Sequence, residues 1–180
     1  MFSFTKKQEI LDISGIKIGG QPGVYPTVLF GGLFFKGKPD FNSGKKQLTN
    51  MLNLSKKTGN PAIPDFFIKK EEKVEEIIDF IDSSLPNNHP FSIDIIEPSL
   101  KVSALEYLGK KNLLSRTIYN SIHVGITDEE RATLKKYTPE MAIIVAFNPK
   151  DKSPDGKIEV LQNGANLTDI GLLDISKIES

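Results

Sequence analysis

Five short, almost wholly apolar segments recur along this chain, and a segment with helical character separates each one from the next. The apolar segments lie at 27–35, 62–68, 91–95, 117–121 and 141–147. Runs of this kind are typical of strands that are buried on both faces of a sheet. Because strands that alternate with helices form βαβ units, the pattern predicts an α/β fold built on a parallel sheet.

The segments between the strands carry the signals of helices. The clearest helix is expected at 71–85, where a single buried stripe follows the i, i+3, i+4, i+7 spacing: Val74, Ile77, Ile78 and Ile81. Gly59-Asn60-Pro61 is a typical stop for a second helix at 44–58. Proline is favoured in the first turn of a helix, and a Thr-x-x-Glu capping box marks a helix start, so further helices are expected from Pro98 and from Thr127.

After the fifth apolar segment the pattern becomes more polar. We expect a polar loop at 148–156 and the start of another helix at 166–178. Gly31-Gly32, inside the first apolar segment, indicates either a bulge or a close approach by another group.

Residues 1–26 precede the alternating pattern. The segments 10–13 and 16–18, joined by Ser14-Gly15, predict a short β-hairpin. Glycine and proline residues between 19 and 26 then indicate an irregular connection. We therefore expect an N-terminal hairpin and lead-in at 1–26, followed by the main domain at 27–180.

Two architectures accommodate five βα units. A five-stranded doubly wound sheet would be complete at 180 residues, whereas a (β/α)₈ barrel usually takes about 250. Periodicity alone favours the doubly wound sheet. However, no GxGxxG or GxxxxGK[ST] motif follows any of the five segments, which argues against the nucleotide-binding members of that class.

Composition excludes several classes of function. The 23 basic and 23 acidic residues give a formal net charge of zero, so there is no electrostatic argument for nucleic acid binding. Without cysteine, the chain can form neither a disulfide nor a thiolate metal site. No apolar run approaches the roughly 20 residues that span a bilayer, and the start lacks the apolar core of a signal peptide. We expect a cytoplasmic protein with no bound metal ion.

Polar side chains stand at the ends of four predicted strands: Asp65, Asp94, Asn120 and Asn148. In either architecture, ligands bind at the C-terminal ends of parallel strands. Because a buried carboxylate or amide needs hydrogen-bond partners, this set favours a ligand rich in N–H and C=O groups, such as a pterin. Each residue also has a plain interpretation as a strand end or a turn, above all Asp65 and Asn148. For Asn148 the reason is that Asn-Pro commonly begins turns.

Five sequence pieces occur in order along the chain: IGGQPGxxPTVLxG, TGNPxxxD, IDxxxPxxxxxALEY, YNSI and AFNP. They stand at 18–31, 58–65, 93–107, 119–122 and 146–149. Together they resemble the signature run of the H subunit of tetrahydromethanopterin S-methyltransferase. Their order and spacing match that family along essentially the whole chain.

The resemblance implies a TIM barrel related to the pterin-binding methyltransferases and the dihydropteroate synthases. This chain would supply the hairpin and about five βα units, and the family continues through three more strands, so 27–180 would be a barrel truncated at its C-terminus. In the wider superfamily an Asp on the third strand and an Asn on the fourth hold the pterin ring. These residues correspond to Asp94 and Asn120, with Asp65 and Asn148 as further candidates.

The reaction implied by the resemblance moves a methyl group from N5 of methyl-tetrahydromethanopterin to the cobalt of a corrinoid. Neither His89 nor His123 lies in a DxHxxG motif that would ligate a corrinoid, so the corrinoid is expected on a partner protein. The implied partners are that protein or other subunits of a methyltransferase complex, including one attached peripherally to a membrane. Because cobalt supplies the nucleophile, the protein's work would be to hold the pterin and stabilise charge at N5, and the sequence identifies no catalytic residue.

Two departures from the family pattern stand out. Ile95 and Ile96 stand where hydroxyl residues are usual, and His123 stands where an amide is usual. A tetrahydrofolate-dependent corrinoid methyltransferase is one alternative, because folate shares the pterin edge. A non-catalytic truncated subunit is a second. Dihydropteroate synthesis is a weaker third, because its phosphate-binding Gly/Arg pattern is not apparent.

Overall fold

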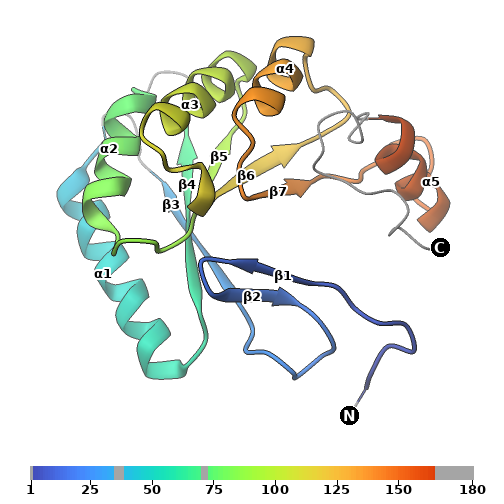
Figure 1. The fold of residues 1–180 in the computed structure, drawn as a ribbon, viewed down its shortest axis with the longest axis horizontal. Coiled ribbons are helices and arrows are strands. Elements are labelled where there is room, and N and C mark those ends of the chain that lie inside the picture. Colours follow the sequence, from blue (N-terminus) through green and yellow to red (C-terminus); the bar gives the residue numbers. More distant parts are fainter. Residues whose placement is uncertain (1, 35–38, 70–72, 165–180) are drawn as a thin grey trace.

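Five parallel strands form the central sheet, in the same order in which they follow one another along the chain (Figure 1). The computed structural model describes residues 2–34, 39–69 and 73–164. The strands are β3 (Leu29–Phe34), β4 (Ala62–Ile68), β5 (Phe91–Ile95), β6 (Thr117–Ile122) and β7 (Met141–Ile144). Each crossover connection therefore moves the chain on by one strand.

Four helices cover one face of this sheet (Figure 1). They are α1 (Phe41–Thr58), α2 (Val74–Ser84), α3 (Pro98–Lys110) and α4 (Asp128–Lys136). The main core lies between them and the sheet, where Phe66 and Ile93 of the strands pack with Ile77, Ile81 and Leu105 of the helices. Sequential strands with helices on a single face make part of a (β/α)₈ barrel. The doubly wound alternative is wrong, because it needs helices on both faces and a reversal of strand order.

The predicted N-terminal hairpin packs against the opposite, inner face of the sheet. It consists of β1 (Ile10–Ile13) and β2 (Ile16–Gly19), paired antiparallel. Ser14 and Gly15 have φ values of 51° and 86°, and two positive φ angles give a tight turn whose twist matches that of the strands. Ile13 is fully buried with Ile63 and Ile118, which lie near the starts of β4 and β6. The hairpin therefore closes the N-terminal end of the inner face.

The glycine pair in β3 marks a close approach and not a bulge. Gly31 and Gly32 keep an unbroken register with β4. The Met51 side chain lies against Gly31, and a Cβ at Gly32 would come within 2.7 Å of the Phe34 ring. Gly59 ends α1 as predicted, with a φ of 73° and an N–H that donates to the Ser55 carbonyl oxygen.

Toward the end of the described chain, two predicted segments differ from the structure. The fifth strand ends at Ile144 and not at Phe147, and all four of its residues are half-buried, not buried. The polar loop expected at 148–156 is shorter, because Ser153 caps a short helix, α5 (Pro154–Glu159), which runs on into a π turn, η2 (Val160–Gly164). The helix expected at 166–178 lies outside the described residues.

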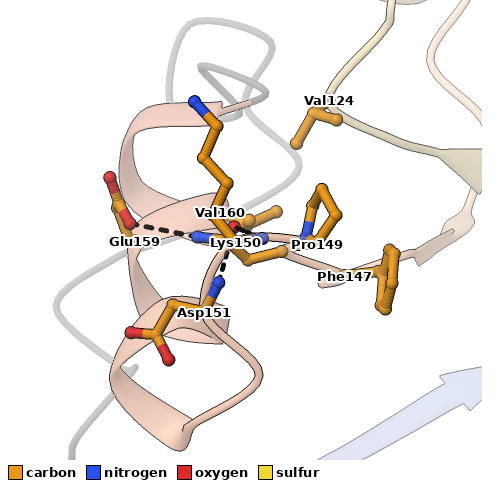
Figure 2. Close-up of a pocket in the computed structure, with 8 residues that line it drawn as sticks. Val124, Phe147, Pro149, Lys150, Asp151, Glu159 and Val160 are labelled. Carbon is orange, nitrogen blue, oxygen red and sulfur yellow. Dashed lines mark hydrogen bonds between the residues drawn. The ribbon is translucent and has the colours of Figure 1, made fainter.

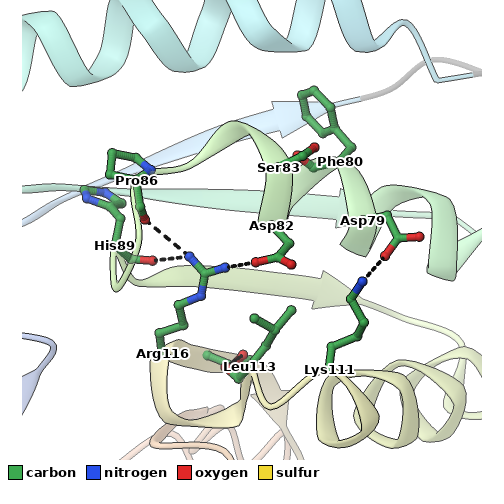
Figure 3. A network of polar contacts seen from close by, with 10 residues as sticks. Asp79, Phe80, Asp82, Ser83, Pro86, His89, Lys111, Leu113 and Arg116 are labelled. Atoms are coloured by element: carbon green, nitrogen blue, oxygen red, sulfur yellow. Dashed lines mark hydrogen bonds and ion pairs between the residues drawn. The ribbon is translucent and has the colours of Figure 1, made fainter.

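A short 3₁₀ turn, η1 (Leu114–Arg116), leads into β6 and anchors its N-terminal end (Figure 3). The nearly buried Arg116 donates to Asp82 at 2.5 Å and to the carbonyl oxygens of Pro86 and His89 at 3.4 and 3.5 Å. A ring nitrogen of His89 lies 3.0 Å from the carbonyl oxygen of Ala62. Because the N-terminal side of such a sheet serves stability and not chemistry, His89 is a structural residue here.

The packing of Ile13 gives the first prediction. Ile13→Ala should lower the free energy of unfolding by about 2–5 kcal/mol, because it leaves a cavity between the hairpin and the sheet. Ile10→Ala, in the same hairpin but 44% exposed, should cost less than about 1 kcal/mol. Urea unfolding followed by circular dichroism measures both variants. Equal losses in the two variants would show that the hairpin does not pack on the sheet as described.

Candidate functional site

Asp65, Asp94 and Asn120 lie on the inner face of three neighbouring strands, Asp65 at the middle of β4 and the other two toward the C-terminal ends of β5 and β6. Asp94 and Asn120 are register partners across β5 and β6. Asp65 and Asn120 lie two residues after Ile63 and Ile118, which the hairpin covers. Because side chains in a strand alternate between faces, all four side chains lie on the inner face. The inner face is therefore apolar at its N-terminal end and polar at its C-terminal end.

The three side chains converge because the sheet is curved. The Asn120 amide nitrogen lies 3.4 Å from Asp65 Oδ1, a long hydrogen bond that spans the intervening strand β5. In a flat sheet, strands separated by one neighbour are roughly 10 Å apart, which is too far for such a contact. Three of the four residues that the sequence predicted for the site, Asp65, Asp94 and Asn120, thus lie near one another on the inner face.

Burial and a neighbouring charge perturb the carboxylate at the centre of this group. Burial raises the pKa of Asp94, and the negative charge of Asp65 raises it further, while the positive charge of Lys101 on α3 opposes both. A carboxyl group in this setting can accept hydrogen bonds when ionised and donate one when protonated. Such perturbed groups are typical of ligand sites.

Two further residues of this inner face were not among the residues that the sequence predicted for the site. Phe67 is the register partner of Asp94, and its ring lies 5.5 Å from that of Phe34 on β3. Ser92 precedes Asp94 by two residues and is fully buried, and its hydroxyl has no hydrogen-bond partner among the described atoms. The alternation of strand faces was the available signal, since each residue lies two positions from a predicted site Asp.

Asn148 serves its own loop. Its Oδ1 accepts hydrogen bonds from the backbone N–H groups of Lys150 and Asp151, at 3.0 and 3.2 Å. Its amide nitrogen donates to the carbonyl oxygen of Gly156 at 3.4 Å and to Glu159 Oε2 at 3.1 Å. The structure therefore gives Asn148 the turn role. Among the described residues none of its hydrogen bonds reaches the other three predicted site residues, and a pterin contact stays a prediction for it.

A hollow of about 420 Å³ lies at this loop (Figure 2). The segment from Phe147 to Asp151, which includes Asn148, lines it together with Val124, Glu159 and Val160. His123 lies next to this region in sequence, and its Nδ1 accepts a hydrogen bond from the Gly125 N–H at 2.9 Å. The departure from the family at His123 thus makes a local turn contact.

The described residues bring no group of three or more His, Asp or Glu side chains into a position to hold a metal ion. None of the helices in the described ranges combines the length and the apolar composition that a bilayer crossing requires.

The perturbed Asp94 gives the second prediction. Because folding raises its pKa, the ionised side chain costs stability as the pH rises above the ordinary Asp value of 3.8. Asp94→Asn should therefore stabilise the fold at pH 7.5 but not at pH 3.5. We expect a gain below about 1 kcal/mol, because the side chain is only partly buried and solvent screens its charge. Urea unfolding at the two pH values tests this, and a variant less stable than wild type at pH 7.5 would contradict it.

Comparison with known proteins agrees with the sequence resemblance. The model of the family described as the tetrahydromethanopterin S-methyltransferase MtrH subunit matches residues 6–179. A Methanosarcina mazei protein, named as the H subunit of a proposed methyltransferase, mtx, is 38% identical over 98% of this chain and 59% of its own length. The H subunit of tetrahydromethanopterin S-methyltransferase from Methanothermobacter marburgensis is 34% identical with the same coverage, 98% and 59%.

The protein of the same name from Methanopyrus kandleri is 33% identical over 95% of this chain and 56% of its own length. The chain thus spans less than two thirds of the length of these curated relatives. The match nevertheless extends over almost the whole of this chain and includes the strands that carry Asp65, Asp94 and Asn120. This chain therefore belongs to the family of the tetrahydromethanopterin S-methyltransferase MtrH subunit.

Proposed function

We propose that this chain is the pterin-binding part of a methyltransferase that takes a methyl group from N5 of methyl-tetrahydromethanopterin. The observation that carries the proposal is that Asp65, Asp94 and Asn120 lie together on the inner face, with Asp94 and Asn120 toward the C-terminal ends of β5 and β6 and Asp65 at the middle of β4. Ligands of barrel enzymes bind at the C-terminal ends of the strands. The substrate class comes from the names of the relatives, which are tetrahydromethanopterin S-methyltransferases.

The chemistry of these side chains suits a pterin. An ionised Asp accepts hydrogen bonds from the 2-amino group and a ring N–H of the pyrimidinone edge, while an Asn offers both a donor and an acceptor. Phe67, beside Asp94, supplies apolar surface for the flat ring. A bound pterin would thus give these partly buried side chains additional hydrogen-bond partners.

Methyl transfer from N5 requires that the amine become a better leaving group. A hydrogen bond or a proton delivered to N5 as the bond to the methyl group breaks has this effect. The Asn120 amide is a hydrogen-bond donor that this face offers. A corrinoid carried by a partner protein would supply the methyl-accepting nucleophile when bound.

The proposed function also implies a partner protein and a cellular compartment. A corrinoid-carrying protein or another component of the methyltransferase complex would approach the C-terminal ends of the strands, in the cytoplasm. Tetrahydrofolate has the same pyrimidinone edge, so both pterins belong in the binding experiment. The names of the relatives favour tetrahydromethanopterin.

The third prediction tests the pterin contact. In the complete protein, Asp94→Ala should weaken binding of N5-methyl-tetrahydromethanopterin about tenfold or more, because it removes a hydrogen bond to a buried ligand group worth about 1–3 kcal/mol. Isothermal titration calorimetry measures the affinity, and circular dichroism confirms that the fold is intact.

A matched control separates the site from general charge effects. Asp155→Ala removes an exposed carboxylate from the first turn of α5 and should leave the affinity unchanged. Equal affinity for Asp94→Ala and wild type would refute the assignment of Asp94. Failure of the wild type to bind either pterin would refute the proposed function itself.

The fourth prediction concerns the 180-residue chain tested alone. We expect methyl transfer to a corrinoid protein no faster than in the absence of the chain. The relatives that it matches are longer, and the outer strands β3 and β7 each pair on one side only within the described sheet. Phe34 and Phe147, near these two edges, are 63% and 57% exposed, so light scattering should also detect self-association. A monodisperse monomer with turnover would overturn this expectation and exclude the non-catalytic alternative.

A further inference from the structure

Three polar side chains are buried between β6 and the helices α3 and α4. Lys101 of α3, Glu130 of α4 and Tyr119 of β6 are each at most 2% exposed. The Lys101 ammonium lies 3.2 Å from Glu130 Oε1, and the Tyr119 hydroxyl donates to the same oxygen at 2.5 Å. The ammonium is also 5.3 Å from the centre of the Tyr119 ring. These three residues form what we call the Lys101 network.

The capping box predicted at Thr127 is only half formed because of this network. The Thr127 hydroxyl accepts a hydrogen bond from the Glu130 N–H at 3.1 Å, as expected. The Glu130 carboxylate, however, points inward to Lys101 and Tyr119. Helix capping therefore does not explain why a glutamate stands at this position.

Helix packing alone does not require the network either. Removing two charges from water costs about as much as their attraction returns, and apolar residues of similar volume often stabilise a protein equally well. The second oxygen of Glu130 is buried without a hydrogen-bond partner among the described atoms, which adds a further cost. The network thus stands where Leu or Met would serve the core at least as well.

The network connects directly to the candidate pterin site. Lys101 Nζ donates to the carbonyl oxygen of Ser121 at 2.8 Å, and Ser121 follows Asn120 in β6. The register of β6 with β7 shifts between Asn120 and Ile122, so Ser121 has no Cα partner in β7. Lys101 thus gives this carbonyl a charged partner at the point where the sheet is irregular.

We propose that Lys101, held by Glu130 and Tyr119, is a positioning residue for the pterin site: it fixes the end of β6, and with it the Asn120 amide, and it places a positive charge behind the Asp94 carboxylate. The inference rests on the proposed function and adds to it a residue that does not touch the pterin. Tyr119 and Asn120 are neighbours on opposite faces of β6, so a constraint on the helix side is transmitted through the strand.

The charge of Lys101 acts on the same site. The charged groups that influence Asp94 are Asp65 on β4, which raises its pKa, and Lys101 on α3, which lowers it. Lys101 therefore helps to keep Asp94 ionised, as an acceptor for the N–H groups of a pterin. Without Lys101, a higher pH should be needed before Asp94 is ionised.

The test uses the full chain and removes both charges together. Lys101→Met with Glu130→Gln leaves no unpaired buried charge, which a single substitution would create. Leu105→Ala is the matched control, because it removes buried apolar contacts one turn further along α3, away from Ser121. Tyr119→Phe removes only the hydroxyl contact to Glu130. It replaces the double variant as the test if the double variant does not fold.

The first readout is the side-chain amide signal of Asn120 in ¹⁵N NMR spectra, assigned by its loss in Asn120→Asp. We expect this signal to move in the double variant, to move less in Tyr119→Phe, and to stay near its wild-type position in Leu105→Ala. An unmoved signal in a folded double variant or in Tyr119→Phe overturns the proposal, whether or not a pterin binds.

The second readout is the affinity for N5-methyl-tetrahydromethanopterin between pH 5 and pH 8. We expect affinity at least tenfold weaker in the double variant, and an acidic loss of binding that begins at a higher pH than in wild type. A loss of stability alone would not shift that profile. If the double variant binds with the affinity of the wild type and its pH profile is not shifted, the positioning role is overturned. If the wild type itself does not bind, the proposed function is refuted, and the NMR signal alone decides whether Lys101 positions Asn120.

Discussion

Strands of a parallel sheet are largely apolar on both faces, so much of each face has to be covered. Helices α1 to α4 cover one face, and the hairpin covers the N-terminal end of the other, where Ile13, Ile63 and Ile118 are fully buried. The hairpin does not extend to the C-terminal end of the inner face. Asp65, Asp94 and Asn120 lie beyond the part that the hairpin covers. The candidate site is therefore the part of the inner face that the hairpin leaves uncovered.

The two ends of the strands are held by different interactions. At the N-terminal ends, Arg116 binds Asp82 and two backbone carbonyls in contacts that join the loop before β5 to α2 and β6. At the C-terminal end of β6, Lys101 binds Ser121 from behind the sheet. The first set fixes the scaffold, whereas the second lies one residue from Asn120. This arrangement agrees with the general separation of stability and chemistry between the two ends of barrel strands.

Local sequence patterns predicted most of the fold, because strands, helices and caps depend on residues a few positions apart. Periodicity alone favoured the doubly wound sheet, which is wrong, since strand order and the face that each helix covers depend on contacts between distant residues. The resemblance to the family predicted part of a barrel, and the structure agrees with it. Strand ends correctly indicated Asp94 and Asn120 as neighbours. The burial of Lys101 could not be predicted, because its partner Glu130 is 29 positions away and a lysine on a helix is usually solvated. Asn148 was assigned by its place after a strand, but its loop turns back to use the amide locally.

The electrostatics of the inner face couple ligand binding to stability. Without a ligand, the Asp94 carboxylate is partly buried beside Asp65, and its raised pKa measures the cost of keeping it charged. A ligand that donates N–H groups to this carboxylate favours its ionised form and offsets that cost. Binding should therefore release protons at pH values near the raised pKa, and it should stabilise the folded chain increasingly as the ligand concentration rises. Lys101 reduces the same cost from the opposite face of β6, so the buried cation and the pterin would act on one carboxylate from its two sides.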